Sequence, residues 1–198
     1  EKVKDNFHVT LLAKDYEGYK NLMKLTSIAH MEGYYYKPRF SKEILKEHSN
    51  GLICFSGCPA AEIPQFLIDG NYEEAKKLTQ WYTDCFKEDF YLELQRHGYD
   101  KILPNIKDTA LRSTLSNVHN ENKLVEEGVI KLSRELGIPL VATNDAHYIK
   151  KADAEAQDAL VCIATGKNVS DIKRLRYIDN PDFYIKSPDE MEDLFSDL

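Results

Sequence analysis

The stretch Ile138-Pro-Leu-Val-Ala-Thr-Asn-Asp-Ala-His-Tyr148 joins a short apolar run to two polar side chains that follow it. The run Pro139–Thr143 is typical of a strand buried on both faces, as in a parallel sheet covered by helices. Asp145 and His147 come directly after this run. In folds with parallel strands, functional groups gather just beyond the carboxyl ends of the strands. The stretch therefore predicts an α/β fold with a site at the strand ends.

Other apolar runs alternate with helical patterns along the chain. We expect further strands within residues 7–13, 51–56 and 90–95, and helices near residues 15–33, 41–48, 71–85, 120–137, 152–163 and from 187 onward. Strands separated by helices indicate a parallel sheet with right-handed crossovers. About four strands are visible, which is enough for an open sheet but too few for a closed barrel. Residues 99–121, with Pro104 and several Asn, Ser and Thr, indicate a long loop or an inserted helix.

The composition limits the class of protein. Of the 198 residues, 42% are hydrophobic and 30% charged, which is the balance of an ordinary globular protein with a core. The chain has no apolar run of the roughly 18 residues that a membrane span needs, so we expect a cytoplasmic location. The net charge of −7 argues against a domain that grips nucleic acid by itself. Four cysteines are too few for a disulfide framework, and the CxxxC spacing of Cys54 and Cys58 disfavours a zinc ribbon.

Four side chains that follow strands are candidate metal ligands. In an extended segment Asp145 and His147 share one face, and a carboxylate beside an imidazole suits divalent zinc, manganese or iron. The alternatives are a turn or helix N-cap for the aspartate and a surface or capping role for the histidine. Cys58 follows the strand at residues 51–56, although a buried structural cysteine is the usual interpretation. His97 follows the strand at residues 90–95 and belongs to the same edge.

The remaining candidates have simpler interpretations. His8 begins a strand, so the strand-end rule does not select it. The other residues considered are three surface or capping histidines, three core cysteines and one exposed glutamate in the first turn of a helix: His30, His48, His119, Cys54, Cys85, Cys162 and Glu62. The sequence has no GxGxxG, GxxxxGK[ST], GxSxG or HExxH motif, which disfavours dinucleotide-binding, P-loop, esterase and zincin functions.

Four motifs in order carry a resemblance to a known family. They are His8-Val-Thr-Leu-Leu-Ala-Lys14, Gly51-Leu-Ile-Cys-Phe-Ser-Gly-Cys58, Tyr91-Leu-Glu-Leu-Gln-Arg-His-Gly98 and the stretch 138–148. Together they resemble the PHP (polymerase and histidinol phosphatase) domain in the polymerizing subunit of bacterial C-family replicative DNA polymerases. The resemblance implies the C-terminal part of a distorted (βα)7 barrel, with parallel strands alternating with helices. It places the PHP domain at residues 1–165, and its end and a linker toward the polymerase palm at 166–198.

The resemblance also implies a polynuclear centre of divalent ions (zinc, manganese or magnesium). Its ligands match His8, Cys58, Asp145 and His147, and His97 is a possible further ligand or a residue lining the site. The family's remaining ligands precede the segment that this sequence resembles, and the palm with the polymerase aspartates follows it. We therefore expect an interior piece of a longer chain, whose site is incomplete and which by itself is inactive.

The resemblance implies that the full-length protein is a DNA-directed DNA polymerase, a nucleotidyltransferase of DNA replication. Its PHP metals would activate water for a 3′–5′ proofreading exonuclease. The implied partners are DNA, a separate exonuclease subunit and a sliding clamp, without a membrane. Two alternatives remain: a structural and interaction module whose metal site has decayed, and a free-standing PHP phosphoesterase. The extension at residues 183–198, which is similar to the family's linker, argues against the phosphoesterase.

Overall fold

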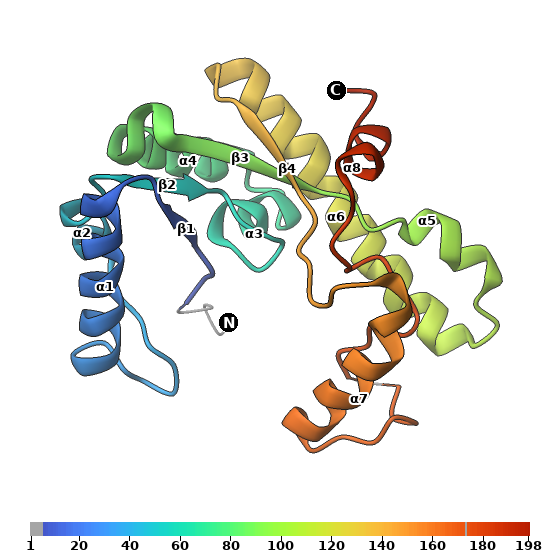
Figure 1. Cartoon of the computed structure of the whole chain (residues 1–198). Coiled ribbons are helices and arrows are strands. Elements are labelled where there is room, and N and C mark those ends of the chain that lie inside the picture. The colour runs from blue at the N-terminus through green and yellow to red at the C-terminus, as the bar shows by residue number, and fades with distance from the viewer. Residues whose placement is uncertain (1–5, 173) are drawn as a thin grey trace. The chain divides into compact units, whose positions relative to one another are not determined.

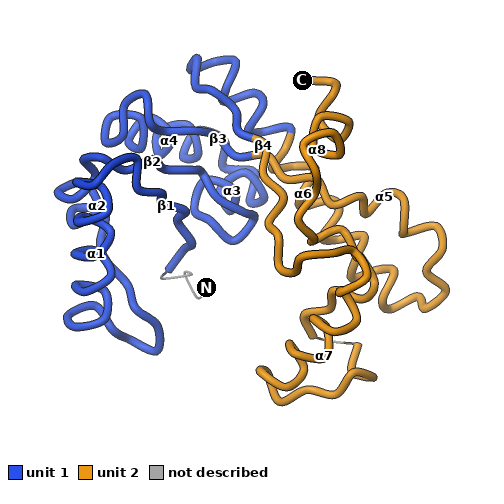
Figure 2. The backbone as a smooth tube through the Cα atoms, in the orientation of Figure 1, with its two compact units in different colours: residues 1–93, 127–141 blue, residues 94–126, 142–198 orange. Residues whose placement is uncertain are grey.

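The computed structural model describes residues 6–172 and 174–198. The chain forms two compact units (Figure 2). Unit 1 contains the described residues up to 93 together with residues 127–141, and unit 2 contains residues 94–126 and 142–198. The helices and strands (Figure 1) are β1 (Thr10–Ala13), α1 (Tyr16–Met31), α2 (Lys42–Glu47), β2 (Leu52–Phe55), α3 (Glu62–Ile68), α4 (Tyr72–Phe86), η1 (Lys87–Asp89), β3 (Phe90–Gln95), α5 (Tyr99–Ile102), η2 (Leu103–Asn105), α6 (Thr109–Leu136), β4 (Leu140–Thr143), η3 (Lys151–Asp153), α7 (Ala154–Thr165) and α8 (Pro188–Leu194).

The strands form one sheet in the order β1-β2-β3-β4. β2 and β3 are parallel, so the mixed α/β class with parallel strands is confirmed. β1 runs antiparallel to β2, with Ala13 opposite Leu52, and the expectation that all strands are parallel is wrong at this strand. The reason is that two helices, α1 and α2, return the chain to the end of the sheet where β1 stops. Among the described residues the sheet is open.

Unit 1 is held together by an apolar core. Helices α3 and α4 pack on each other, and α4 also contacts β2 (Figure 1). The Tyr82 ring of α4 stacks on Phe90 of β3 with 5.4 Å between centroids. Completely or almost completely buried side chains of this unit are Leu25, Leu52, Cys54, Ile63, Ala75, Phe90, Leu92, Val129 and Leu132. Burial of such side chains is worth about 1.5–3 kcal/mol each, so this core stabilises the sheet that carries the strand ends.

Unit 2 has a smaller apolar cluster, together with three buried polar side chains. Tyr148, Ala154 and Tyr177 form the cluster, and Val161, Phe183 and Tyr184 pack against it. The buried polar side chains of the unit are His97, Asp158 and Asn180. Asp158 receives two hydrogen bonds from the Arg174 guanidinium, at 2.9 and 2.6 Å, and both side chains are only 1% exposed. Unit 2 is therefore fastened largely by polar contacts between its loops.

Several helices begin where local signals place them, whereas α6 does not. α2 and α8 lie where helices were expected, and Ser41 and Ser187 cap them; Ser187 forms a capping box with Glu190. The exception is α6, which begins at Thr109 rather than near Asn120. The Asp108 carboxylate accepts a hydrogen bond from the backbone N–H of Leu111 at 2.8 Å and so starts the helix. Of the two expectations for residues 99–121, a long loop or an inserted helix, the helix is therefore the one that forms from Thr109 onward.

Within residues 6–172 and 174–198, no helix is both long enough and apolar enough to cross a membrane.

Candidate metal centre

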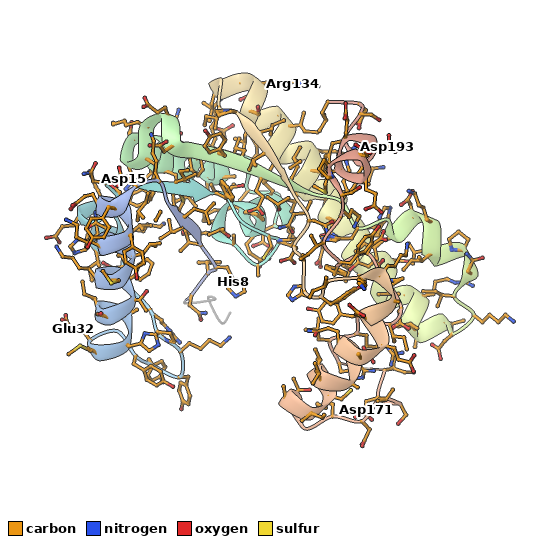
Figure 3. All side chains as sticks on the ribbon, in the orientation of Figure 1. His8, Asp15, Glu32, Arg134, Asp171 and Asp193 are labelled. Carbon is orange, nitrogen blue, oxygen red and sulfur yellow. The ribbon has the colours of Figure 1, made fainter. Side chains whose placement is uncertain are left out.

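His8 and Cys58 are close together in unit 1. His8 forms a parallel β-bridge with Ala61, just before β1 begins (Figure 3). Cys58 lies in the turn that follows β2, and its Sγ is 3.8 Å from His8 Nδ1. The turn needs glycine at position 57, because φ there is +84° and a Cβ would lie 2.6 Å from that of Ala61. The tight turn thus keeps the thiol next to the imidazole of a residue 50 positions away.

Asp145 and His147 are close together in unit 2. Their Oδ2 and Nε2 atoms are 3.4 Å apart, and both side chains are more than one third exposed. We expected an extended segment to place them on one face, but Asp145 has φ +45° and the backbone turns there. A left-handed conformation is tolerated by aspartate better than by most residues. The two side chains therefore meet through a turn and not through strand alternation.

The loop that carries this second pair is fastened by the segment 183–186. The backbone N–H of His147 donates to the Phe183 carbonyl at 2.8 Å. The Asn144 side-chain amide donates to the Tyr184 carbonyl, and its oxygen accepts from Lys186 Nζ at 2.8 Å. From the sequence, this segment was assigned only to the extension at residues 183–198, and its contacts with the loop were missed. The contacts span about 40 positions, and the local pattern carries no signal of them.

His97 supports the same loop from inside unit 2. It is buried, its ring stacks on Phe183 with 4.1 Å between centroids, and its Nε2 is 3.3 Å from the Asn144 carbonyl oxygen. A carbonyl only accepts hydrogen bonds, so Nε2 carries the proton that it donates. Burial lowers the pKa of His97, which favours the neutral ring. Asn180 donates to the His97 carbonyl at 2.7 Å and fixes its backbone.

The spacing within each pair suits a divalent ion. Ligand distances of about 2.0–2.3 Å with tetrahedral angles place two ligand atoms roughly 3.4–3.6 Å apart. The oxygen and nitrogen of Asp145 and His147, at 3.4 Å, match this separation. The 3.8 Å between the Cys58 sulfur and the His8 nitrogen corresponds to a somewhat wider angle at the ion. Among the described residues, however, no group of three or more His, Cys, Asp or Glu side chains could hold a metal. Each unit supplies two candidate ligands.

The other titratable candidates have structural roles. Cys54 and Cys162 are buried as expected, and burial raises the pKa of the Cys54 thiol, which keeps it protonated. Glu62 was expected to be exposed; instead it is half-buried and pairs with Lys42 at 2.8 Å. His30 in α1 donates from Nδ1 to the Thr26 carbonyl at 2.8 Å. None of these contacts contributes to either ligand pair.

Comparison with known proteins places part of the chain in a family. Residues 1–97 match the family model of the PHP domain. Residues 1–97 therefore belong to the PHP domain family, whose model they match.

The relatives all carry the same name, DNA polymerase III subunit alpha, and come from different bacteria. Over 98% of its length the chain is 47% identical to the DNA polymerase III subunit alpha of Borreliella burgdorferi, covering 15% of that protein. Over its full length it is 41% identical to the subunit from Helicobacter pylori, again covering 15%. Over 94% of its length it is 40% identical to that of Deinococcus radiodurans, covering 12%. The chain thus corresponds to one segment of DNA polymerase III alpha subunits and spans 12–15% of these relatives.

Proposed function

We propose that the chain is a metal-binding PHP segment of a replicative DNA polymerase III alpha subunit. The observation that carries the proposal is the pair spacing of 3.8 Å for His8 and Cys58 and 3.4 Å for Asp145 and His147. One pair offers an imidazole with a thiolate and the other an imidazole with a carboxylate, and these donor types suit zinc or manganese. The distorted (βα)7 barrel, with the PHP domain at residues 1–165 and the linker at 166–198, belongs to this proposal.

When bound, such ions would activate water for hydrolysis of a phosphodiester, the chemistry of a 3′–5′ exonuclease. The chain's own residues would hold the ligands in place. The 57–61 turn keeps Cys58 beside His8, and Asn144 with Lys186 fastens the loop of the second pair. Loss of a side chain that orients a metal ligand typically lowers metal affinity by about 10- to 100-fold. His97 would act here as a buried support of the Asn144 backbone.

For the whole protein we propose DNA polymerization, with DNA, an exonuclease subunit and a sliding clamp as partners. The catalytic aspartates for polymerization would lie in the segments of the alpha subunit that this chain does not cover. A free-standing phosphoesterase is disfavoured, because the similarity to alpha subunits extends over 98–100% of the chain, residues 166–198 included. With part of the ligand set outside the chain, we expect the 198-residue protein alone to have no nuclease activity.

The experiment measures metal binding by the 198-residue chain, through titration with zinc and manganese and elemental analysis after gel filtration. The variants Asp145→Asn/His147→Asn and His8→Asn/Cys58→Ser each remove one pair. We expect metal affinity to fall at least about tenfold in both. Matched controls with the same substitutions elsewhere, Asp193→Asn/His119→Asn and His30→Asn/Cys85→Ser, are expected to bind like the unaltered chain. Equal metal binding by ligand variants and controls would favour a module with a decayed site and refute the proposal.

A further inference from the structure

A pocket of about 430 Å³ opens beside His8 in unit 1. Its walls come from residues 6–9, from the segment 37–42 and from the Leu45, Glu62 and Tyr82 side chains. The candidate metal ligand His8 is thus part of the wall of a cavity that could hold a group of several heavy atoms. Apart from His8, the residues of the wall are not among the four candidate metal ligands, so the metal site does not explain why they line a pocket.

The pocket is rich in cations. Lys37, Arg39 and Lys42 line it, against the single carboxylate of Glu62. Glu62 is already paired with Lys42 at 2.8 Å. Within the described part of the chain, Lys37 and Arg39 have no carboxylate partner, and the buried Nε of Arg39 has no hydrogen-bond partner. A buried donor without an acceptor is unfavourable, and an anionic ligand would supply the missing acceptor. The chain carries a net charge of −7, so this positive pocket is a local exception.

Three exposed aromatic rings adjoin these cations. Tyr34, Tyr35 and Tyr36 are 60%, 64% and 81% exposed. The Arg39 guanidinium lies over the Tyr35 ring at 5.2 Å, and Tyr36 meets Tyr35 edge to face at 4.7 Å. Tyr35 N–H donates to the Lys37 carbonyl at 3.1 Å across a tight turn, in which Tyr36 has φ +58°. The rings are thus held on the surface by the backbone.

We propose that this pocket and the adjoining loop of residues 34–39 bind single-stranded DNA. Lys37 and Arg39 would contact phosphates, and the rings of Tyr35 and Tyr36 would stack on bases. Proteins that bind single strands without reading their sequence combine cations for the backbone with exposed aromatic rings for the bases. A free anion would use the cations but would leave the rings without a role. If His8 belongs to a metal centre, as proposed above, the pocket would deliver the strand to that centre; binding itself does not require the metal.

The test is fluorescence anisotropy of a labelled oligothymidylate titrated with the 198-residue chain at low salt. EDTA is present throughout, so that the result does not depend on metal binding. We expect Lys37→Ala/Arg39→Ala to weaken binding about tenfold or more. The slope of log affinity against log salt should become less steep by about 1.4, or roughly 0.7 for each phosphate that is no longer neutralised. The control Lys24→Ala/Lys46→Ala removes the same charge from exposed lysines of unit 1 outside the pocket.

Separate variants test whether the tyrosine rings stack on bases. Tyr35→Ala/Tyr36→Ala is expected to weaken binding about tenfold, because the two bases no longer have rings to stack on. Tyr35→Phe/Tyr36→Phe keeps the rings and should bind like the unaltered chain. Tyr16 and Tyr19 are also exposed and in contact with each other, and Tyr16→Ala/Tyr19→Ala is therefore the matched control. These side chains are on the surface, so circular dichroism should show unchanged folding in all the tyrosine variants.

Three outcomes would overturn the proposal. The first is equal binding by the pocket variants and the unaltered chain. The second is an equal loss in the lysine or tyrosine controls, which would mean nonspecific attraction. The third is full displacement of the oligonucleotide by inorganic phosphate at a concentration equal to that of the oligonucleotide's phosphate groups. This outcome would show that the pocket binds anions and not single-stranded DNA as such. Absence of metal binding in the separate titration would refute the metal site and leave the DNA result unaffected.

Discussion

The two units hold their candidate ligand pairs by different physical means. In unit 1 the His8–Cys58 pair lies at the edge of a sheet stabilised by an apolar core that includes Phe90 and Leu92. In unit 2 the Asp145–His147 pair lies on a loop held by hydrogen bonds, ring contacts and buried charge. Apolar packing is nondirectional and shared among many side chains, whereas each buried polar interaction depends on one partner. Unit 2 should therefore be more sensitive to the loss of a single polar atom.

The largest expected effect is in unit 2, at the buried pair of Asp158 and Arg174. Asp158→Asn leaves the guanidinium without its counter-charge, and we expect a loss of about 3–5 kcal/mol in the free energy of unfolding, measured by urea denaturation. The control Asp193→Asn, at an exposed position of α8, should change stability by less than about 0.5 kcal/mol. A loss at Asp158 no larger than in the control would remove the contrast between the units.

This pair also gives unit 2 an acid sensitivity. The Arg174 guanidinium lowers the pKa of Asp158 below its ordinary value. A carboxyl with a depressed pKa in the folded state stabilises the fold above the unfolded pKa of about 3.9 and loses that contribution as the pH falls through the folded value. The stability difference between the unaltered chain and Asp158→Asn should therefore shrink in that acid range. A difference that stays constant down to the folded pKa and below would contradict this account.

In unit 1 the position most sensitive to substitution is a close approach between two backbone segments. A Cβ on Gly18 would lie 1.7 Å from the Gly51 carbonyl oxygen, where α1 crosses the start of β2. Backbone cannot move aside cheaply, so Gly18→Ala should cost about 3 kcal/mol or more in thermal or urea unfolding. Gly70→Ala is the comparison: Gly70 has φ +74° and no atom within 4 Å of a Cβ, so only the left-handed strain of about 1–2 kcal/mol remains. Equal costs would mean that the close approach is absent.

The smallest effect concerns the loop of the second pair. Asn144→Ala removes the side-chain contacts to Tyr184 and Lys186 while leaving Asp145 and His147 intact. We expect metal affinity to fall about 10- to 100-fold, equivalent to roughly 1.4–2.7 kcal/mol, in a zinc titration. Asn168→Ala, at an exposed asparagine of the same unit, should leave the affinity unchanged. An Asn144 variant with full affinity would show that the loop does not need this fastening.

Local sequence patterns predicted much of the fold. The strands within residues 51–56 and 90–95 and the helices near residue 41 and after residue 187 are where the pattern indicated, because periodicity and capping depend on near neighbours. The start of α6 was missed because Asp108, the residue that caps it, stood in a segment whose polar composition also fits a loop. Polar residues on the exposed side of a helix give the same sequence composition as a loop.

By itself, the sequence determined the chemistry that this protein can carry: a cysteine after β2, Asp145 and His147 after β4, and a lysine–arginine segment beside three tyrosines. Only the tertiary structure decided which of these meet. It reversed β1 against β2, brought His8 to a thiol 50 positions away and tied Asn144 to Lys186. The physical reason is that residue types and local geometry are fixed within a few positions. Contacts between distant segments are chosen by the packing of whole helices and strands.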